Sequence, residues 1–208
     1  MSSRRPTGAK SAFSTFGLNK SLLRAISEAG FKEPRPIQAK TIPQALKGQD
    51  ILGLAQTGTG KTAAFALPII EYFIESKGQN PRALILAPTR ELAIQTHAEI
   101  EVLAKYTNIR ATTVFGGVSA SAQMRALKTR PDIVVACPGR LLDLAGSGHI
   151  NLDGIEVLVL DEADHMLDMG FLPDIKRIIS RLPDSRQNLL FSATMPREIR
   201  HLTDRLLH

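Results

Sequence analysis

The sequence predicts an α/β domain, with a mostly parallel central sheet and helices on both faces. From residue 50 onward, short apolar runs recur at Ile51–Ala55, Ala83–Ala87, Ala111–Phe115, Ile133–Ala136, Val157–Leu160 and Asn188–Phe191. Longer segments of helical character separate them, among them Thr62–Phe73, Glu91–Leu103 and Phe171–Leu182. Short buried strands that alternate with helices are typical of a parallel sheet covered on both faces, with right-handed crossover connections.

Size and composition favour one globular domain in a reducing compartment. The chain has 208 residues and is 43% hydrophobic, which suffices for a sizeable core. No apolar run approaches the ~20 residues that span a bilayer, and no apolar stretch follows the basic residues at the start, so we expect neither a membrane partner nor a secretory signal. The single cysteine, Cys137, excludes an internal disulfide and suits the cytoplasm.

The net charge of +6 is unevenly placed. Arg4, Arg5 and Lys10 supply +3 of it, and residues 1–10 contain no acid. We expect residues 1–11 to form a flexible basic tail and residues 12–208 to form the domain. The charge permits an acidic partner such as nucleic acid but does not identify one.

A helix and a proline-rich segment precede the first strand. Asn19 is a candidate N-cap and Gly30 a candidate end for a helix whose apolar residues recur at helical spacing, at Leu22, Leu23, Ile26 and Ala29. The segment with Pro34, Pro36 and Pro43 then predicts a turn and a short helix.

The residues that follow the strands are small, charged or glycine-rich. In order they read AQTGTGKT, PTRELA, FGG, CPGR, DEAD and SAT. Ligands of parallel sheets bind outside the carboxyl ends of the strands, so chemistry is expected there. Ordinary polar loops would explain one or two of these segments but not the whole set.

The first of these segments, residues 55–62, matches a phosphate-binding loop. Gly58 and Gly60 let successive N–H groups point at phosphate oxygens, and the next helix adds its positive end. Lys61 reaches the β- and γ-phosphates, and Thr62 offers a hydroxyl to Mg²⁺. We assign nucleotide binding to the whole loop, which also contains Gln56, Thr57 and Thr59. The alternative is a glycine-rich turn with a chance lysine.

Two adjacent carboxylates, Asp161 and Glu162, follow the fifth strand. Asp161 is placed to hold Mg²⁺ through water opposite Thr62, and Glu162 to orient or deprotonate the attacking water. The two acids could instead only cap the next helix. Combined with Lys61 they form a catalytic set for hydrolysis of a metal-bound nucleotide.

Together these motifs resemble the DEAD-box family of ATP-dependent RNA helicases. The letters DEAD are the family signature, SAT follows at 192–194, and residues 30–38 resemble the family's Q motif. The resemblance covers residues 13 to about 207. It implies a RecA-like P-loop domain, with a Q-motif segment at 12–39 and an ATP- and RNA-binding core at 40–208. It also implies ATP and Mg²⁺ as cofactors, RNA as partner and a cytoplasmic location.

In the family the Q motif reads adenine. A side-chain amide such as that of Gln38 presents a donor and an acceptor side by side, matching adenine N6 and N7. The resemblance also suggests that Phe31 packs against the base and that Phe13 buttresses Gln38. The alternatives are a surface glutamine and phenylalanines that belong to the core.

The resemblance further implies sequence-independent contacts with the RNA backbone. The residues are Thr89, Arg90, Gly116, Gly117, Cys137, Pro138, Gly139 and Arg140. The alternatives are simple turns at Gly116–Gly117 and Pro138–Gly139, and an ion pair of Arg90 with Glu91 or another acid. Cys137 departs from the threonine usual in the family, and a thiol is the weaker hydrogen-bond donor.

Asp164, Ser192 and Thr194 are expected to couple hydrolysis to strand separation. In the family, the serine and threonine of SAT hydrogen-bond the DEAD motif, and Asp164 is the natural partner. His165 receives no catalytic role.

The family's second RecA-like domain, which supplies an arginine to the γ-phosphate, has no counterpart in these motifs. No His-Arg pair occurs in the chain, which ends soon after SAT. We therefore expect this chain to be a monomeric first domain that needs a C-terminal RecA-like domain in cis. Alone it should bind adenine nucleotides modestly, hydrolyse almost no ATP and unwind nothing.

Two other functions use the same residues. One is a DNA translocase on the same P-loop core, against which the Q motif and the DEAD letters argue. The other is a nucleotide-gated RNA clamp or scaffold that unwinds little.

Overall fold

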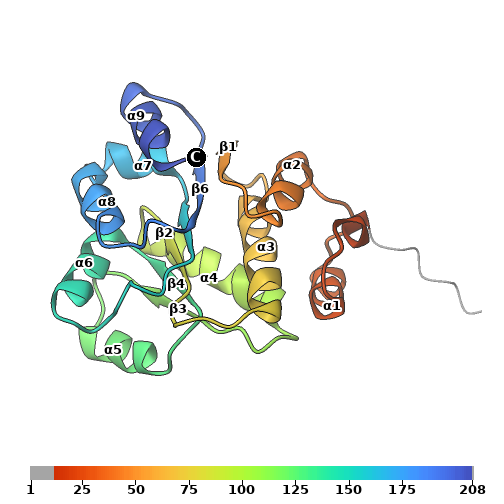
Figure 1. Cartoon of the computed structure of the whole chain (residues 1–208), viewed down its shortest axis with the longest axis horizontal. Helices are drawn as coiled ribbons and strands as arrows, with labels where there is room; N and C mark the ends of the chain where they lie inside the picture. Colours follow the sequence, from red (N-terminus) through yellow and green to blue (C-terminus); the bar gives the residue numbers. More distant parts are fainter. Residues whose placement is uncertain (1–11, 208) are drawn as a thin grey trace, which may run out of the picture.

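The computed structural model describes residues 12–207, and its centre is one parallel six-stranded sheet (Figure 1). The strand order is β1-β6-β5-β2-β4-β3, and every neighbouring pair is parallel. The strands are β1 (Ile51–Leu54), β2 (Ala83–Leu86), β3 (Ala111–Val114), β4 (Ile133–Ala136), β5 (Val157–Leu160) and β6 (Gln187–Ser192). All six predicted strands are confirmed, with ends displaced by at most one residue.

Helices connect the strands as predicted. A 3-10 helix, η1 (Ala12–Phe16), precedes α1 (Lys20–Glu28), α2 (Pro36–Ala45), α3 (Lys61–Glu75), α4 (Arg90–Ala104), α5 (Ala120–Lys128), α6 (Pro138–Gly146), α7 (Ala163–Asp168), α8 (Leu172–Ile179) and α9 (Arg197–Leu206). The Asn19 side chain caps α1 by accepting a hydrogen bond from Ser21 N at 2.9 Å, which confirms the predicted start. The expected flexible tail at 1–11 lies outside the described residues.

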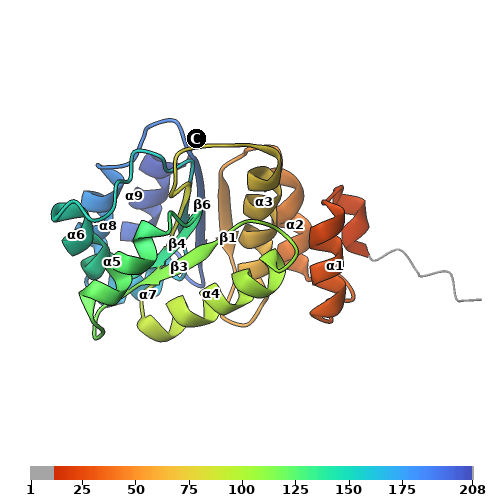
Figure 2. The same cartoon turned by 90° about the horizontal axis from the view of Figure 1, so that it is seen from below.

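The sheet is covered on both faces, so the core has two layers (Figure 2). Alternate residues of β2 divide between them: Ile85 packs with α3 and α4, and Leu84 packs with α6 and α8. α3 is buried nearly all round because α2, α4 and the sheet surround it. This burial fixes the start of α3, where the predicted phosphate-binding loop ends.

The strand order places the predicted motifs along one edge of the sheet. β1, β6 and β5 are neighbours, so the phosphate-binding loop, SAT and DEAD lie together at their carboxyl ends. β2, β4 and β3 form the other half of the sheet, and the segments predicted to face RNA follow these strands. Within residues 12–207, no helix combines the length and the apolar character needed to cross a membrane.

Candidate functional site: a nucleotide pocket beside a row of backbone-rich loops

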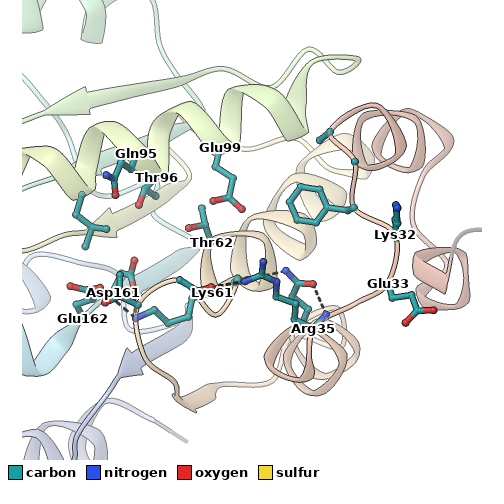
Figure 3. Close-up of a pocket in the computed structure, with 18 residues that line it drawn as sticks. Lys32, Glu33, Arg35, Lys61, Thr62, Gln95, Thr96, Glu99, Asp161 and Glu162 are labelled. Atoms are coloured by element: carbon teal, nitrogen blue, oxygen red, sulfur yellow. Dashed lines mark hydrogen bonds and ion pairs between the residues drawn. The ribbon is translucent and has the colours of Figure 1, made fainter.

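A pocket of about 610 Å³ opens at the carboxyl ends of β1 and β5 (Figure 3). Four separate segments line it: the Q-motif segment, the phosphate-binding loop, one face of α4 and the end of β5. The lining residues used below are Phe31, Arg35, Gln38, Thr57, Gly58, Gly60, Lys61, Thr62, Gln95, Thr96, Glu99, Asp161 and Glu162.

The phosphate-binding loop has the backbone that its glycines allow. Gly58 and Gly60 have φ of 78° and 90°, a region that other residues rarely adopt. A Cβ at Gly60 would lie 2.6 Å from Gln38 Nε2, so only glycine permits this contact. Gly60 is the N-cap of α3, and Lys61 begins the helix, whose positive end therefore points into the pocket.

Lys61 lies between the loop and the two acids of the DEAD motif. Its Nζ is 3.6 Å from Asp161 Oδ1 and 3.7 Å from Glu162 Oε1, and it donates to Ala55 O at 3.4 Å. The side chains of Lys61 and Asp161 are 5% and 3% exposed. Burial raises the pKa of Asp161 to about 6, although the charge of Lys61 opposes the shift. The phosphate-binding loop and the two carboxylates thus meet in one desolvated pocket.

Asp161 and Thr62 fit the chemistry of a nucleotide-bound Mg²⁺. Asp161 Oδ1 is buried without a hydrogen-bond partner, which is the state expected of a carboxylate that awaits a cation. Residues 12–207 contain no group of three or more His, Cys, Asp or Glu able to hold a metal ion. Mg²⁺ commonly uses one or two protein ligands together with phosphates and waters, and Asp161 and Thr62 are residues of the right kind.

Glu162 has an unusual backbone. Its φ of 53° and ψ of 54° are left-handed, which costs a non-glycine residue about 1 kcal/mol or more. Its carboxylate accepts a hydrogen bond from Thr57 Oγ1 at 2.6 Å and lies 3.4 Å from His165 Nδ1. The left-handed turn directs Glu162 back over the phosphate-binding loop. Glu162 occupies the N-cap position of α7, but its side chain makes no capping hydrogen bond. Capping the helix therefore does not explain the left-handed backbone.

Gln38 is fully buried, so the alternative of a surface glutamine is wrong. Its Oε1 accepts from Arg35 N at 2.9 Å, and its Nε2 donates to Gly60 O at 3.1 Å. The Arg35 guanidinium also donates to Gly58 O. The Q-motif segment is therefore joined to both glycine carbonyls of the loop.

Phe31 lines the pocket and is partly exposed. Behind it, Phe13 is fully buried and meets Phe31 edge-on, with ring centroids 6.1 Å apart. Phe13 therefore supports the wall of the pocket through Phe31.

The remaining loop residues differ in position. Thr57, Gly58 and Thr62 line the pocket, whereas the lining does not include Gln56 and Thr59. Thr59 Oγ1 donates to Gln56 O at 2.7 Å, which holds the shape of the loop. In this structure these two residues therefore shape the loop from outside the pocket.

The residues predicted to face RNA follow β2, β3 and β4 and are partly or fully exposed, except for buried Pro138 at the start of α6. Thr89 caps α4 by accepting from Leu92 N at 3.2 Å. The Arg90 guanidinium lies over the Phe115 ring, 5.2 Å from its centroid, and Arg140 donates to Val118 O at 3.2 Å. These arginines are already oriented by protein contacts.

The loops themselves supply mainly backbone. Gly116 and Gly117 are exposed, Gly117 has a φ of 78°, and Gly139 lies within the first turn of α6. At Cys137, burial and then the negative charge of Glu91 raise the pKa of the thiol to about 11. The thiol is therefore protonated at neutral pH, and Cys137 behaves as a small packing residue.

Asp164, Ser192 and Thr194 form one hydrogen-bonded cluster. Asp164 Oδ2 accepts from Thr194 N and from Thr194 Oγ1, both at 2.8 Å. Ser192 Oγ accepts from Asp164 N at 3.2 Å and donates to Thr194 O at 2.7 Å. Burial opposes ionisation of Asp164, but the hydrogen bonds from Thr194 and Ser192 prevail and lower its pKa.

Sequence reasoning gave no role to several residues that line the pocket, among them Arg35 and the α4 residues Gln95, Thr96 and Glu99. Helical spacing puts 95, 96 and 99 on one face, but the pattern does not say that this face turns toward the pocket. Burial raises the pKa of Glu99, while the Thr62 hydroxyl and the Ala63 amide lower it.

Comparison with known proteins supports the same reading over most of the chain. Residues 35–202 match the family model described as DEAD/DEAH box helicase. An ATP-dependent RNA helicase CshA from Listeria monocytogenes is 52% identical over 196 residues, which cover 94% of this chain and 38% of the relative. A DEAD-box ATP-dependent RNA helicase CshA from Geobacillus kaustophilus is 46% identical, with coverage of 94% and 42%. The chain thus spans about two fifths of these relatives.

A solved structure shows the same fold. The crystal structure of a DEAD box protein from Methanococcus jannaschii aligns with a TM-score of 0.89 and 44% identity, covering 94% of this chain and 53% of that one. The predicted fold class, a RecA-like α/β domain, is therefore confirmed. With its motifs in order along one sheet edge and its sequence matched over 35–202, this chain belongs to the DEAD/DEAH box helicase family.

Proposed function

We propose that this chain is the ATP- and RNA-binding first domain of an ATP-dependent RNA helicase. Together with a C-terminal RecA-like domain in cis it would couple ATP hydrolysis to local unwinding of RNA duplexes or to remodelling of RNA–protein complexes, in the cytoplasm. The observation that carries the proposal is the convergence of Lys61 with Asp161 and Glu162 within 4 Å across one buried pocket. A triphosphate with its magnesium needs a lysine and carboxylates that face one another across one pocket.

The nucleotide would enter by separating Lys61 from the two acids. Lys61 and the N-terminal end of α3 would bind the β- and γ-phosphates, and Thr62 and Asp161 would hold Mg²⁺, partly through water. When bound there, the ion would neutralise charge on the phosphates. Glu162 would then orient or deprotonate the attacking water.

Gln38 keeps the right groups for adenine. An amide has two N–H donors and two lone pairs on its oxygen, and the protein uses one of each, at Gly60 O and Arg35 N. The second N–H and the second lone pair would meet adenine N7 and N6, while guanine would present an acceptor where a donor is needed. This supports a preference for ATP over GTP, with Phe31 against the base.

RNA would lie across the loops after β2, β4 and β3. The exposed backbone of Gly116 and Gly117 and the partly exposed backbone of Gly139, together with Arg90 and Arg140, suit phosphate oxygens and carry no base information. The cluster of Asp164, Ser192 and Thr194 bridges the DEAD motif and β6, so it would transmit the state of the nucleotide to a second domain.

The test is ATP turnover by the intact protein with RNA or DNA of the same sequence. We expect RNA to stimulate hydrolysis and DNA not to; equal stimulation would favour a DNA translocase. A duplex-release assay beside an RNA-retention assay would distinguish a helicase from a clamp. The 208-residue chain alone should bind ADP but hydrolyse ATP near background, and robust RNA-stimulated turnover by this chain would contradict the proposal.

A further inference from the structure

One face of α4 presents polar side chains to the nucleotide pocket that the roles assigned above do not use. Gln95, Thr96 and Glu99 all line the pocket, and their spacing puts them on one side of the helix. Thr96 is 1% exposed, and its Oγ1 is buried without a hydrogen-bond partner. A buried hydroxyl without a hydrogen-bond partner costs about 1–3 kcal/mol. Because Thr96 lines the pocket, we expect its hydroxyl to gain a hydrogen-bond partner when a ligand binds there.

These side chains face the two residues that fit Mg²⁺. In Figure 3, Glu99 extends from α4 toward Thr62, and Gln95 and Thr96 lie on the side of Asp161. The contact of Glu99 with the Thr62 hydroxyl also contributes to the pKa of Glu99. The polar face of α4 and the phosphate-binding loop therefore line the same pocket, in which Thr62 and Asp161 fit Mg²⁺.

The charge of Glu99 restricts what can bind there. A carboxylate beside a triphosphate is repelled by it unless a cation lies between them. Mg²⁺ gives up its waters reluctantly and usually keeps several when it binds through phosphates and one or two protein ligands. Those waters are strong donors, and the face of α4 offers acceptors: the Gln95 amide oxygen, Thr96 Oγ1 and the Glu99 carboxylate.

We propose that Gln95, Thr96 and Glu99 form an outer wall of the magnesium site, accepting hydrogen bonds from the waters of the nucleotide-bound ion. They are positioning residues, since they act on the ion through water, and Glu99 has the largest share because it carries charge. The inference rests on the proposed nucleotide binding. It adds that the polar face of α4 determines how strongly this binding depends on magnesium.

The test measures ADP affinity by calorimetry, first in excess EDTA and then across a magnesium titration. In the unmodified chain, magnesium should strengthen ADP binding. In Glu99→Gln we expect the magnesium concentration for half-maximal effect to rise about 10-fold, a loss typical of residues that orient metal ligands from outside. Affinity in EDTA should stay the same or improve, because a charge that repels phosphate is gone.

Two further variants make the test specific. Glu101→Gln removes an exposed carboxylate on the same helix and should leave the magnesium titration unchanged. Thr96→Val keeps the shape of the side chain and should shift the titration in the same direction as Glu99→Gln, by less. If Glu99→Gln does not fold, Thr96→Val carries the test.

The proposal is overturned if both wall variants leave the magnesium titration where it was, or if they change ADP affinity equally with and without the metal. Failure of the unmodified chain to bind ADP would instead refute the proposed nucleotide site itself. The two failures are therefore distinguishable.

Discussion

The two halves of the sheet edge present different groups to a ligand: buried charged side chains in one half and exposed backbone in the other. The half over β1, β6 and β5 buries charged side chains: Lys61 and Asp161 are almost completely inaccessible, and one oxygen of Asp161 has no hydrogen-bond partner. The half over β2, β4 and β3 exposes backbone at Gly116 and Gly117, and contacts with Phe115 and Val118 already orient its arginines. A compact, highly charged ligand requires the first arrangement, and a long, uniform polyanion requires only the second.

This difference predicts that single substitutions should weaken ligand binding far more in the nucleotide half. A compact charged ligand held by a few buried groups loses several kcal/mol of binding when one of them is removed, whereas one exposed contact among many to a polyanion contributes little. The substitutions below are arranged to test that ranking.

The largest effect is expected for Lys61→Ala. ADP affinity should fall about 100-fold or more, because removing one partner of a buried charge pair costs about 2–5 kcal/mol. Calorimetry would measure it, with Lys128→Ala, on the exposed surface of α5, as the control. An unchanged ADP affinity would refute the phosphate-loop assignment.

Asp164→Asn should separate turnover from unwinding in the intact protein. The Thr194 hydroxyl and amide both donate to one oxygen of Asp164, and a neutral amide accepts such bonds more weakly. Duplex release should fall about 10-fold while RNA-stimulated ATP hydrolysis changes less, given that bonds to charged groups contribute about 1.5–3 kcal/mol. Equal loss of both activities would show that the cluster only stabilises the fold.

Asp161→Asn should stabilise the nucleotide-free chain at neutral pH by about 1–3 kcal/mol. The pKa of Asp161 is raised from 3.8 to about 6, so its ionisation disfavours the folded state, and this cost appears between those values and is complete above pH 6. Thermal unfolding at pH 5 and pH 7.5 would measure it. The stability gained by Asp161→Asn should be smaller at pH 5 than at pH 7.5. An equal gain at both pH values would contradict the raised pKa of Asp161.

Arg140→Ala should weaken RNA binding by only about 5-fold, with equal effect on different RNA sequences, and should reduce the salt dependence by about one charge. ADP affinity should not change, since Arg140 lies outside the pocket lining. Titrations of labelled RNA at several salt concentrations would test this. A loss confined to one sequence would argue for base contacts.

Cys137→Thr should have the smallest effect, with RNA affinity within about two-fold, because the backbone rather than the side chain is offered to phosphate. The raised pKa of about 11 also predicts that the folded thiol reacts about 100-fold more slowly with iodoacetamide at pH 8 than the unfolded chain does. Rapid alkylation of the folded protein would contradict its burial.

The two halves also differ in how far the sequence predicted them. The strands and the phosphate-binding loop were predictable because short apolar runs and the spacing of glycines are local properties of the sequence. The neighbours of Gln38 were not, since its contact with Gly60 joins residues 22 positions apart. The α4 wall was missed for a related reason: Thr96 and Glu99 are ordinary helix residues until packing turns them toward the pocket. In the other half, the roles proposed for Arg90 and Arg140 depend on family resemblance, because surface arginines have no distinctive spacing.

The missing Cβ at Gly60 has a consequence for how such a protein can change. A Cβ at position 60 would lie 2.6 Å from Gln38 Nε2 and displace the amide proposed to recognise adenine, and Gly60 is also the N-cap of the helix proposed to hold the phosphates. In the proposed site, selectivity for the purine therefore cannot be relaxed at position 60 without loosening the hold on the phosphates. A lineage that needed another base would have to rebuild the first helical turn of α3 along with it.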